Sequence, residues 1–474
     1  MKKLLKIFFS AFLIFNQCFF GAAYAKENVE KEPIYSKQQI KEDIDFMLKT
    51  MENVHPNLYF AASKENIKKE IDKELNSINK PLTAIEVYRK FAPIVSEFED
   101  GHTWLTEPQD YMEKVYNSDK MLFISLTIRD GKMYIKDTFK KEYDKYKDWE
   151  IISINDKQTS DIYSQISKYI SCPTKSFKEA AMQRRFTDYY HIDNELKNEY
   201  TLIIRKDNKE QTIKLKGIGM EEIKKINAKK EDYVDYSYKK LNDNTGLITF
   251  NTFRDFDKFK KFLDETFEKI NKDHISNLII DLRNNGGGNS QLGDLLIEYI
   301  YDGNYKQADR MDIKISNEIL EYYKDNLKKQ GMGEEEIKKV IGEFYPKYLG
   351  KVYTSKGPAS RHFTDKPKFK GDSYFLTSRY TFSSAVMLAS TVKDYNIGYL
   401  IGAETGGLPT EYGDIYWFRL PNTKLAIAVS HKYFVRPNGL DTKRGVIPDY
   451  NINDLENKDA LDIALEIIKN KAYK

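Results

Sequence analysis

The stretch from Ser373 to Gly407 reads SYFLTSRYTFSSAVMLASTVKDYNIGYLIGAETGG, and its pattern predicts a strand, a tight turn, a helix and a second strand. The apolar run Tyr374 to Leu376 suits a short buried strand, whereas the apolar residues between Ala385 and Val392 recur at helical spacing. Ser383 therefore lies at a helix start. Unpaired N–H groups there carry partial positive charge and can stabilise an oxyanion beside the hydroxyl.

Two interpretations of Ser383 are consistent with this position. Serine is a common helix N-cap, and capping alone explains a serine here. The setting Thr381-Phe382-Ser383-Ser384-Ala385, however, resembles the T-x-S-[AS]-A motif of the carboxyl-terminal processing (tail-specific) peptidases and the related tricorn-core proteases. This resemblance implies a serine peptidase whose nucleophile is Ser383.

A glycine-rich segment, DLRNNGGG from Asp281 to Gly288, comes after another predicted strand. Glycines allow close backbone approach to a reacting group, although a phosphate loop or a plain turn would also use them. The segment lacks both the Walker pattern and G-x-G-x-x-G. It resembles the D-L-R-x-N-x-G-G element of the same peptidases, which implies an oxyanion hole formed by the amides of Gly287 and Ser384.

A serine hydroxyl needs a neighbouring base to become a nucleophile. The processing branch of the family uses a lysine 25 residues after the serine, but that position is Leu408, so the resemblance excludes a Ser–Lys dyad. The tricorn-like branch uses a histidine in D-[GS]-H-T, which matches 100-DGHT-103 and implies that His102 is the base. His431 stays a rival base, and His55 is interpreted as a residue that caps or turns the chain.

An acid is expected to orient the imidazole. The position 58 residues after Ser383, where tricorn-like enzymes carry a glutamate, is Asp441. Asp449 and Glu404 are alternatives, and an exposed turn carboxylate without a catalytic role fits Asp441 as well. No cysteine–histidine cluster, HExxH or EF-hand pattern occurs, so we expect neither a metal nor a cofactor.

The first 25 residues combine three lysines, an apolar run and a small-residue cleavage site, which predicts a secretory signal peptide. A retained membrane anchor is the alternative. Cleavage would remove three of the four net positive charges, 4 − 3 = +1, so nothing favours nucleic-acid binding. It would also leave Cys172 as the sole cysteine, which excludes an intrachain disulfide. We expect a secreted or cell-envelope-associated protein without a later membrane span, acting on polypeptides, with its oligomeric state open.

The pattern divides the mature chain into three parts. Residues 26–112 form a helical domain that carries the DGHT histidine, with capping boxes at Ser36 and Thr83. Residues 113–222 form a β-rich module in which 148–156 resembles the G-D-x-I-x-x-I-N-G signature of PDZ domains, with both glycines replaced. Residues 223–474 form the α/β peptidase core, with a helical insertion at about 304–368.

The family resemblance implies a crotonase-like (ClpP-like) α/β core with a helical cap and a PDZ-like module. The expected function is hydrolysis of peptide bonds by a secreted serine peptidase. A rival is a non-catalytic protein of the same fold that binds hydrophobic ligands, as the interphotoreceptor retinoid-binding proteins do. The 34 Tyr and 27 Phe suit such a surface, although a core also consumes aromatic residues.

Overall fold

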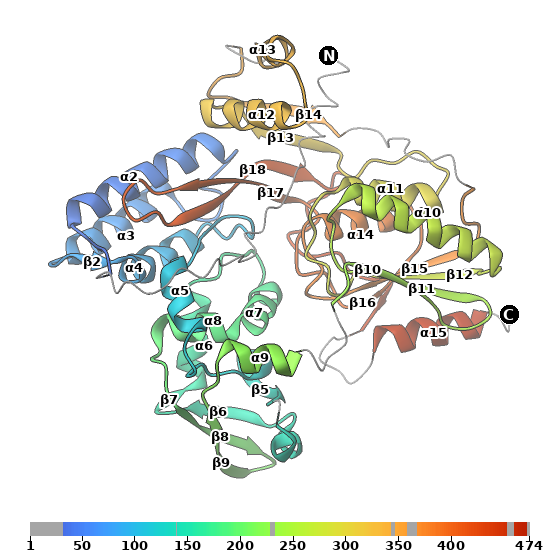
Figure 1. Cartoon of the computed structure of the whole chain (residues 1–474). Helices are drawn as coiled ribbons and strands as arrows, with labels where there is room; N and C mark the ends of the chain where they lie inside the picture. The colour runs from blue at the N-terminus through green and yellow to red at the C-terminus, as the bar shows by residue number, and fades with distance from the viewer. Residues whose placement is uncertain are drawn as a thin grey trace.

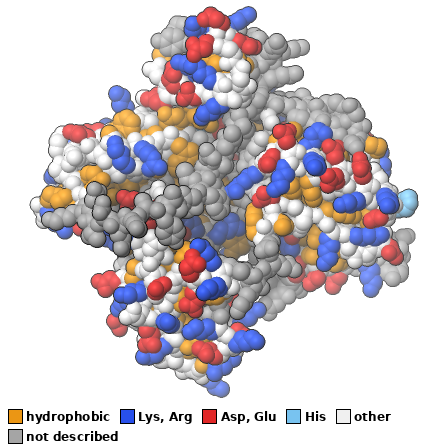
Figure 2. Space-filling model, viewed as in Figure 1, with side chains coloured by type: hydrophobic (Ala, Val, Ile, Leu, Met, Phe, Trp, Pro, Cys, Tyr) orange, Lys and Arg blue, Asp and Glu red, His pale blue; other side chains and the backbone are white. Residues whose placement is uncertain are grey.

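The computed structural model describes residues 32–138, 140–227, 233–342, 347–357, 367–452 and 459–471. The predicted signal peptide lies outside these residues. Within them, no helix has both the length and the apolar character needed to cross a bilayer. Figure 1 shows the N-terminal helices on one side, the β-rich module below them, and the α/β core on the other side. Acidic and basic side chains are mixed over the face in Figure 2, in keeping with the small net charge.

The N-terminal part is helical, as predicted. Ser36 caps its first helix through a capping box with Gln39, and Thr83 forms a second box with Glu86. Both boxes satisfy backbone N–H groups that would otherwise lack partners. The elements are β1 (Ile34–Tyr35), α2 (Lys37–Val54), α3 (Lys64–Ser77), β2 (Leu82–Thr83), α4 (Ala84–Ser96), β3 (Trp104–Leu105) and α5 (Gln109–Tyr116).

The middle part contains an antiparallel sheet with strand order β4-β5-β6-β8-β9, and β7 pairs with β6. Apolar residues alternate along these strands, so one face is buried. The helices α6 to α8 cover the sheet and were not predicted. The elements are β4 (Ser125–Arg129), β5 (Lys132–Asp137), η1 (Lys141–Tyr146), β6 (Glu150–Ile154), β7 (Lys157–Gln158), α6 (Thr159–Ser167), α7 (Lys175–Arg184), α8 (Phe186–Asp193), β8 (Glu199–Lys206), β9 (Lys209–Lys216) and α9 (Met220–Asn227).

The core sheet has the order β10-β11-β12-β15-β16-β19, and every pair except β10–β11 is parallel. Helices α10, α11 and α14 bury one face and α15 the other, which explains the continuous apolar runs of the central strands. The predicted α/β core is thus present. Its elements are β10 (Tyr236–Lys240), β11 (Thr245–Phe250), α10 (Phe256–Lys272), β12 (Asn277–Asp281), α11 (Gln291–Ile300), β15 (Asp372–Thr377), α14 (Ser384–Asp394), β16 (Tyr399–Gly402), β19 (Tyr450–Asn451) and α15 (Ala460–Lys471).

A second sheet joins the N-terminal part to the core. Its order is β14-β13-β18-β17, and β3 pairs with β18. The segment predicted as a helical insertion contributes two of these strands besides its two helices. One continuous hydrophobic cluster consequently runs from α2 through the middle module to β18. The elements are β13 (Arg310–Lys314), α12 (Asn317–Lys329), α13 (Glu334–Gly342), β14 (Val352–Lys356), β17 (Glu411–Arg419) and β18 (Ala426–Val435).

Asp43 fixes the turn between β17 and β18 to α2. Its buried carboxylate accepts hydrogen bonds from the Asn422 N–H at 2.7 Å, the Thr423 N–H at 2.8 Å and the Thr423 hydroxyl at 2.6 Å. A carboxylate that satisfies backbone donors in this way makes charge-assisted bonds, which are stronger than neutral ones. The N-terminal helix and the hairpin are therefore held in one position.

We predict that Asp43→Ala lowers the free energy of unfolding by about 2–4 kcal/mol, because two N–H groups lose their acceptor in a buried setting. The control is Asp45→Ala, which removes an exposed surface pair with Lys41 and should cost less than about 0.5 kcal/mol. Urea denaturation of both variants measures the difference. Equal losses would show that the Asp43 bonds do not hold the hairpin.

Candidate active site

Ser383 has a strained backbone immediately before α14. Its φ of 55° and ψ of −128° match the first central position of a type II′ turn, which normally requires glycine. The turn is closed by the Ala385 N–H, which donates to the Phe382 carbonyl at 3.2 Å. The Ser383 side chain makes no capping hydrogen bond. Strain of this kind is costly and concentrates at functional sites, so the capping interpretation of Ser383 loses its support.

His102 and Ser383 are in contact although 281 positions separate them. The His102 Nε2 lies 3.0 Å from the Ser383 Oγ, which is hydrogen-bond distance. The histidine reaches this position because the DGHT loop leads directly into β3, and β3 pairs with β18 through Trp104–Ala428 and Leu105–Ile427. The second sheet therefore carries the imidazole to the start of α14.

Asp100 shapes the loop that holds His102. Its carboxylate accepts from the His102 N–H at 2.9 Å and from the Thr103 hydroxyl at 2.5 Å, and Thr103 in turn accepts from the Ser430 N–H on β18 at 3.1 Å. Asp100 thus binds the backbone of the motif rather than the imidazole ring. The loop is fixed to the same strand that pairs with β3.

His55 adds a contact that the sequence did not reveal. It caps α2, and its Nδ1 accepts from the Asn57 N–H at 3.0 Å, as its interpretation as a capping or turning residue requires. Its Nε2 also lies 3.4 Å from the Asp100 carboxylate. Burial alone would raise the pKa of Asp100. The hydrogen bond and charge of His55 outweigh burial and lower this pKa to about 2. Asp100 therefore stays negative at neutral pH.

A stack of three rings holds the His102 imidazole. Phe382 lies against it with ring centroids 4.7 Å apart, and Phe177 lies behind Phe382 at 4.3 Å. The imidazole also hydrogen bonds the backbone of Tyr412 on β17. Because Nε2 faces Ser383, the neutral tautomer with its proton on Nδ1 is the one that leaves Nε2 free to accept a proton.

Burial lowers the pKa of His102 below its usual value. The negative charge of Asp100, the hydrogen bond to Tyr412 and the negative charge of Asp414 oppose this shift. The side chain is only 5% exposed, so the balance favours the neutral imidazole. A neutral imidazole is the form that can act as a general base.

The glycine-rich segment packs directly against the serine. A Cβ on Gly287 would lie 2.7 Å from the Ser383 Cβ and 2.8 Å from the Ser384 amide nitrogen, so only glycine fits, and its φ of 92° also favours glycine. The Gly287 N–H donates to the Asn285 side chain at 2.8 Å. The Ser384 hydroxyl donates to the Gly288 carbonyl at 2.6 Å. Both residues named for the oxyanion hole thus lie beside Ser383.

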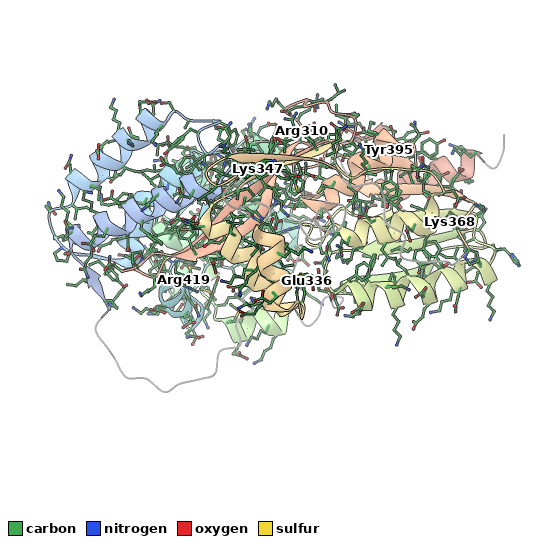
Figure 3. All side chains as sticks on the ribbon, turned by 90° about the horizontal axis from the view of Figure 1, so that it is seen from above. Arg310, Glu336, Lys347, Lys368, Tyr395 and Arg419 are labelled. Carbon is green, nitrogen blue, oxygen red and sulfur yellow. The ribbon has the colours of Figure 1, made fainter. Side chains whose placement is uncertain are left out.

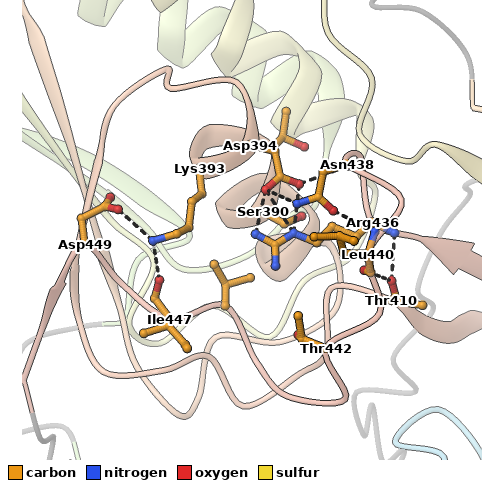
Figure 4. Close-up of polar contacts among 12 residues, drawn as sticks. Ser390, Lys393, Asp394, Thr410, Arg436, Asn438, Leu440, Thr442, Ile447 and Asp449 are labelled. Carbon is orange, nitrogen blue, oxygen red and sulfur yellow. Dashed lines mark hydrogen bonds and ion pairs between the residues drawn. The ribbon is translucent and has the colours of Figure 1, made fainter.

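The structure does not bring Asp441 to the imidazole, which corrects its expected position. Its carboxylate pairs with Lys443 at 2.5 Å and accepts from the Tyr433 hydroxyl at 3.5 Å in an exposed loop. The two alternatives are also engaged elsewhere. Asp449 pairs with Lys393 at 2.8 Å, as Figure 4 shows, and Glu404 pairs with Arg444 at 2.6 Å. The acids whose charges act on His102 are Asp100 and Asp414.

The rival base His431 faces away from the nucleophile. Its Nε2 lies 3.1 Å from the Tyr323 hydroxyl and 3.5 Å from Asp414, and its side chain is fully buried. Burial lowers its pKa to about 4. Asp414 forms a further buried ion pair with Lys432. His431 thus belongs to a buried polar cluster behind the site.

A cavity of about 720 Å³ opens beside His102. Aromatic side chains of Phe60, Phe382, Tyr412 and Tyr433 form much of its wall, and Glu411 also lines it. Its size suits one or two amino-acid side chains or a small ligand. No sequence motif predicted a role for Glu411, Tyr412 or Asp414. They lie on β17, where polar and apolar residues alternate as in any half-buried strand. Among the described residues, no group of histidine, cysteine or acidic side chains could hold a metal ion.

The model of peptidase family S41 matches residues 244–452, which contain both the glycine-rich segment and Ser383. Two solved structures share the fold over nearly the whole chain. Mature CPAF complexed with lactacystin is 14% identical with a TM-score of 0.64, and the match covers 92% of this chain and 98% of that one. Mature CPAF is 14% identical with a TM-score of 0.62, over 92% and 95%. A comparison with curated proteins found no match.

Fold and family together define the class of this protein as a serine peptidase. The matched core belongs to peptidase family S41, as the resemblance of its motifs implied.

We predict that Gly101→Ala lowers kcat by about 10- to 100-fold, since displacement of a catalytic group has effects of this size. The added Cβ would lie 2.9 Å from the Phe382 ring, which cannot move freely between Phe177 and His102. The control is Gly333→Ala, where a Cβ would meet nothing within 4 Å. Peptide hydrolysis and thermal unfolding test both variants, and unchanged kcat in Gly101→Ala would show that the ring stack does not position His102.

Proposed function

We propose that the protein is an exported peptidase that hydrolyses peptide bonds with Ser383 as nucleophile and His102 as base. The observation that carries the proposal is the 3.0 Å contact between the Ser383 Oγ and the His102 Nε2. The serine hydroxyl gives its proton to Nε2 as it attacks the scissile carbonyl. His102 then donates this proton to the leaving amine, and water repeats the cycle on the acyl-enzyme.

The imidazolium that forms during attack needs nearby negative charge. Asp100 and Asp414 supply it, and the backbone hydrogen bond to Tyr412 also favours the protonated ring. We therefore assign the acid's electrostatic role to Asp100 and Asp414 instead of Asp441. This arrangement stabilises His102 through two buried charges and a backbone hydrogen bond, rather than through one carboxylate on the ring.

The oxyanion is bound by the amides of Ser384 and Gly287 in this proposal. The Ser384 N–H lies at the start of α14, where the helix offers no acceptor and the dipole favours negative charge. The Gly287 N–H donates to the Asn285 side chain in this structure. It would either donate to this oxygen and the oxyanion at once or leave the Asn285 oxygen for the oxyanion. Each such donor contributes about 10²–10³ to turnover.

The remaining parts of the proposal concern the scaffold and the location. We propose a crotonase-like arrangement for the core and a PDZ-like arrangement for the sheet β4-β5-β6-β8-β9. Export rests on the signal-peptide pattern of residues 1–25. The rival function, binding of hydrophobic ligands without catalysis, gives no role to a strained serine in contact with a neutral histidine.

Ser383→Ala and His102→Ala should each lower peptide hydrolysis by about 10³-fold or more, because either change removes the activated alcohol. Ser383→Ala should also abolish labelling by a fluorophosphonate probe. His431→Gln is the matched control, since it changes a buried histidine that does not touch Ser383, and it should retain labelling. Hydrolysis that survives Ser383→Ala would refute the proposed nucleophile.

The acid limb of kcat/KM against pH should have a midpoint below about 6.5, because burial lowers the pKa of His102 and the base must be neutral. Asp414→Asn should move this midpoint to still lower pH, since a negative charge near His102 raises its pKa and the variant removes that charge. It should also lower kcat and stability, because Lys432 loses its buried partner. Asp441→Asn should change neither the midpoint of the acid limb nor kcat. A shift of the midpoint in this variant would return the acid's role to Asp441.

A further inference from the structure

Glu411 faces the cavity beside the catalytic pair. It lies two residues before Gly413 on β17, in unbroken register with β18 through Glu411–Phe434 and Gly413–Lys432. A Cβ on Gly413 would lie 3.7 Å from the His102 Cε1. Because alternate residues of a strand share a face, the Glu411 side chain extends on the same side as the imidazole. Glu411 accordingly lines the cavity.

The Glu411 carboxyl has no hydrogen bond or ion pair anywhere in the part of the chain that the structure describes, although it is partly buried. Burial and the negative charge of Asp100 both raise the pKa of Glu411 well above its usual range. Burying an acid without a partner is unfavourable, and natural proteins rarely leave such a group unmatched. The cavity therefore holds a carboxyl group that no described residue pairs with.

Three other charged residues of the cavity wall, Arg310, Asp312 and Lys443, have partners. Asp312 accepts from the Thr354 hydroxyl at 2.7 Å and lies 3.6 Å from Arg310. Lys443 pairs with Asp441. Arg310 lies on β13, and Figure 3 shows it between the N-terminal helices and the core. Glu99 also lines the cavity without an ion pair among the described residues, but it is exposed to solvent, so Glu411 is the partly buried acid that a ligand cation can meet.

We propose that Glu411 binds a cationic side chain, lysine or arginine, of the polypeptide substrate in this cavity. The aromatic lining of the same cavity suits such a residue, because aromatic rings can pack on its aliphatic stem and face its charge. Glu411 loses its proton to solvent when the cation enters, and the ion pair forms in a setting of low dielectric. The proposal rests on the function assigned to Ser383 and adds a substrate class to it.

The first test compares acetylated peptides that differ only in lysine or norleucine, with that residue moved through each position. Lysine and norleucine have similar stems, so a difference reports the charge. The wild type should favour lysine at one position by about 10-fold or more in kcat/KM, and Glu411→Gln should lose that preference while norleucine peptides change less than about 2-fold. Asp312→Asn is the matched control, because Asp312 lines the same cavity but already has partners, and it should keep the preference.

The second test measures binding without turnover. The Kd values of the two peptides are compared for Ser383→Ala and for Ser383→Ala/Glu411→Gln by calorimetry, so a failed catalytic assignment does not affect the result. Fluorophosphonate labelling of Glu411→Gln at the wild-type rate shows that the nucleophile is intact. Equal affinity of Ser383→Ala for lysine and norleucine peptides overturns the proposal. A preference that appears only with a free amino terminus also overturns it, since the bound cation is then the terminal ammonium.

Discussion

The pairing of β3 with β18 is the constraint on which the site depends. The DGHT loop has no regular structure of its own between α4 and β3, so its position is decided by the strand it leads into and by the residues packed around it. The loop is fixed by two backbone pairs between β3 and β18, by the Thr103–Ser430 hydrogen bond and by the Asp100 carboxylate. His102 is therefore placed by a sheet composed of segments from both ends of the chain, and Ser383 by a different sheet.

Close packing and backbone strain keep Ser383 in contact with His102. The type II′ conformation of Ser383 lifts its side chain out of the capping position, and Gly287 fills the space behind it at a distance that excludes any Cβ. Phe382 serves both elements, since it precedes the serine and stacks on the imidazole. The core and the second sheet consequently meet at one aromatic ring.

Three acidic residues around this site have different environments. Asp100 is negative and binds backbone donors, Asp414 is negative and pairs with Lys432, and Glu411 has no partner within the described residues. The negative charges of Asp100 and Asp414 act on His102 and oppose the lowering of its pKa by burial. Glu411 lines the same cavity as His102, so the proposed catalysis and the proposed selectivity depend on one electrostatic environment.

The amino-acid sequence was sufficient to predict the elements whose signals are local. The capping boxes at Ser36 and Thr83, the strand–turn–helix around Ser383, and the glycines of 281–288 all reflect short-range backbone requirements, and DGHT named His102 through a four-residue motif. The partners of His102 depend instead on tertiary packing. A spacing of 58 residues suggested Asp441, but a residue count does not determine where a side chain points. The Asp441 carboxylate is held in an exposed loop by Lys443 and Tyr433. Tyr412, Asp414, His55 and Glu411 have no local signature, because each gains its role from a strand or helix end packed against residues far away in the chain.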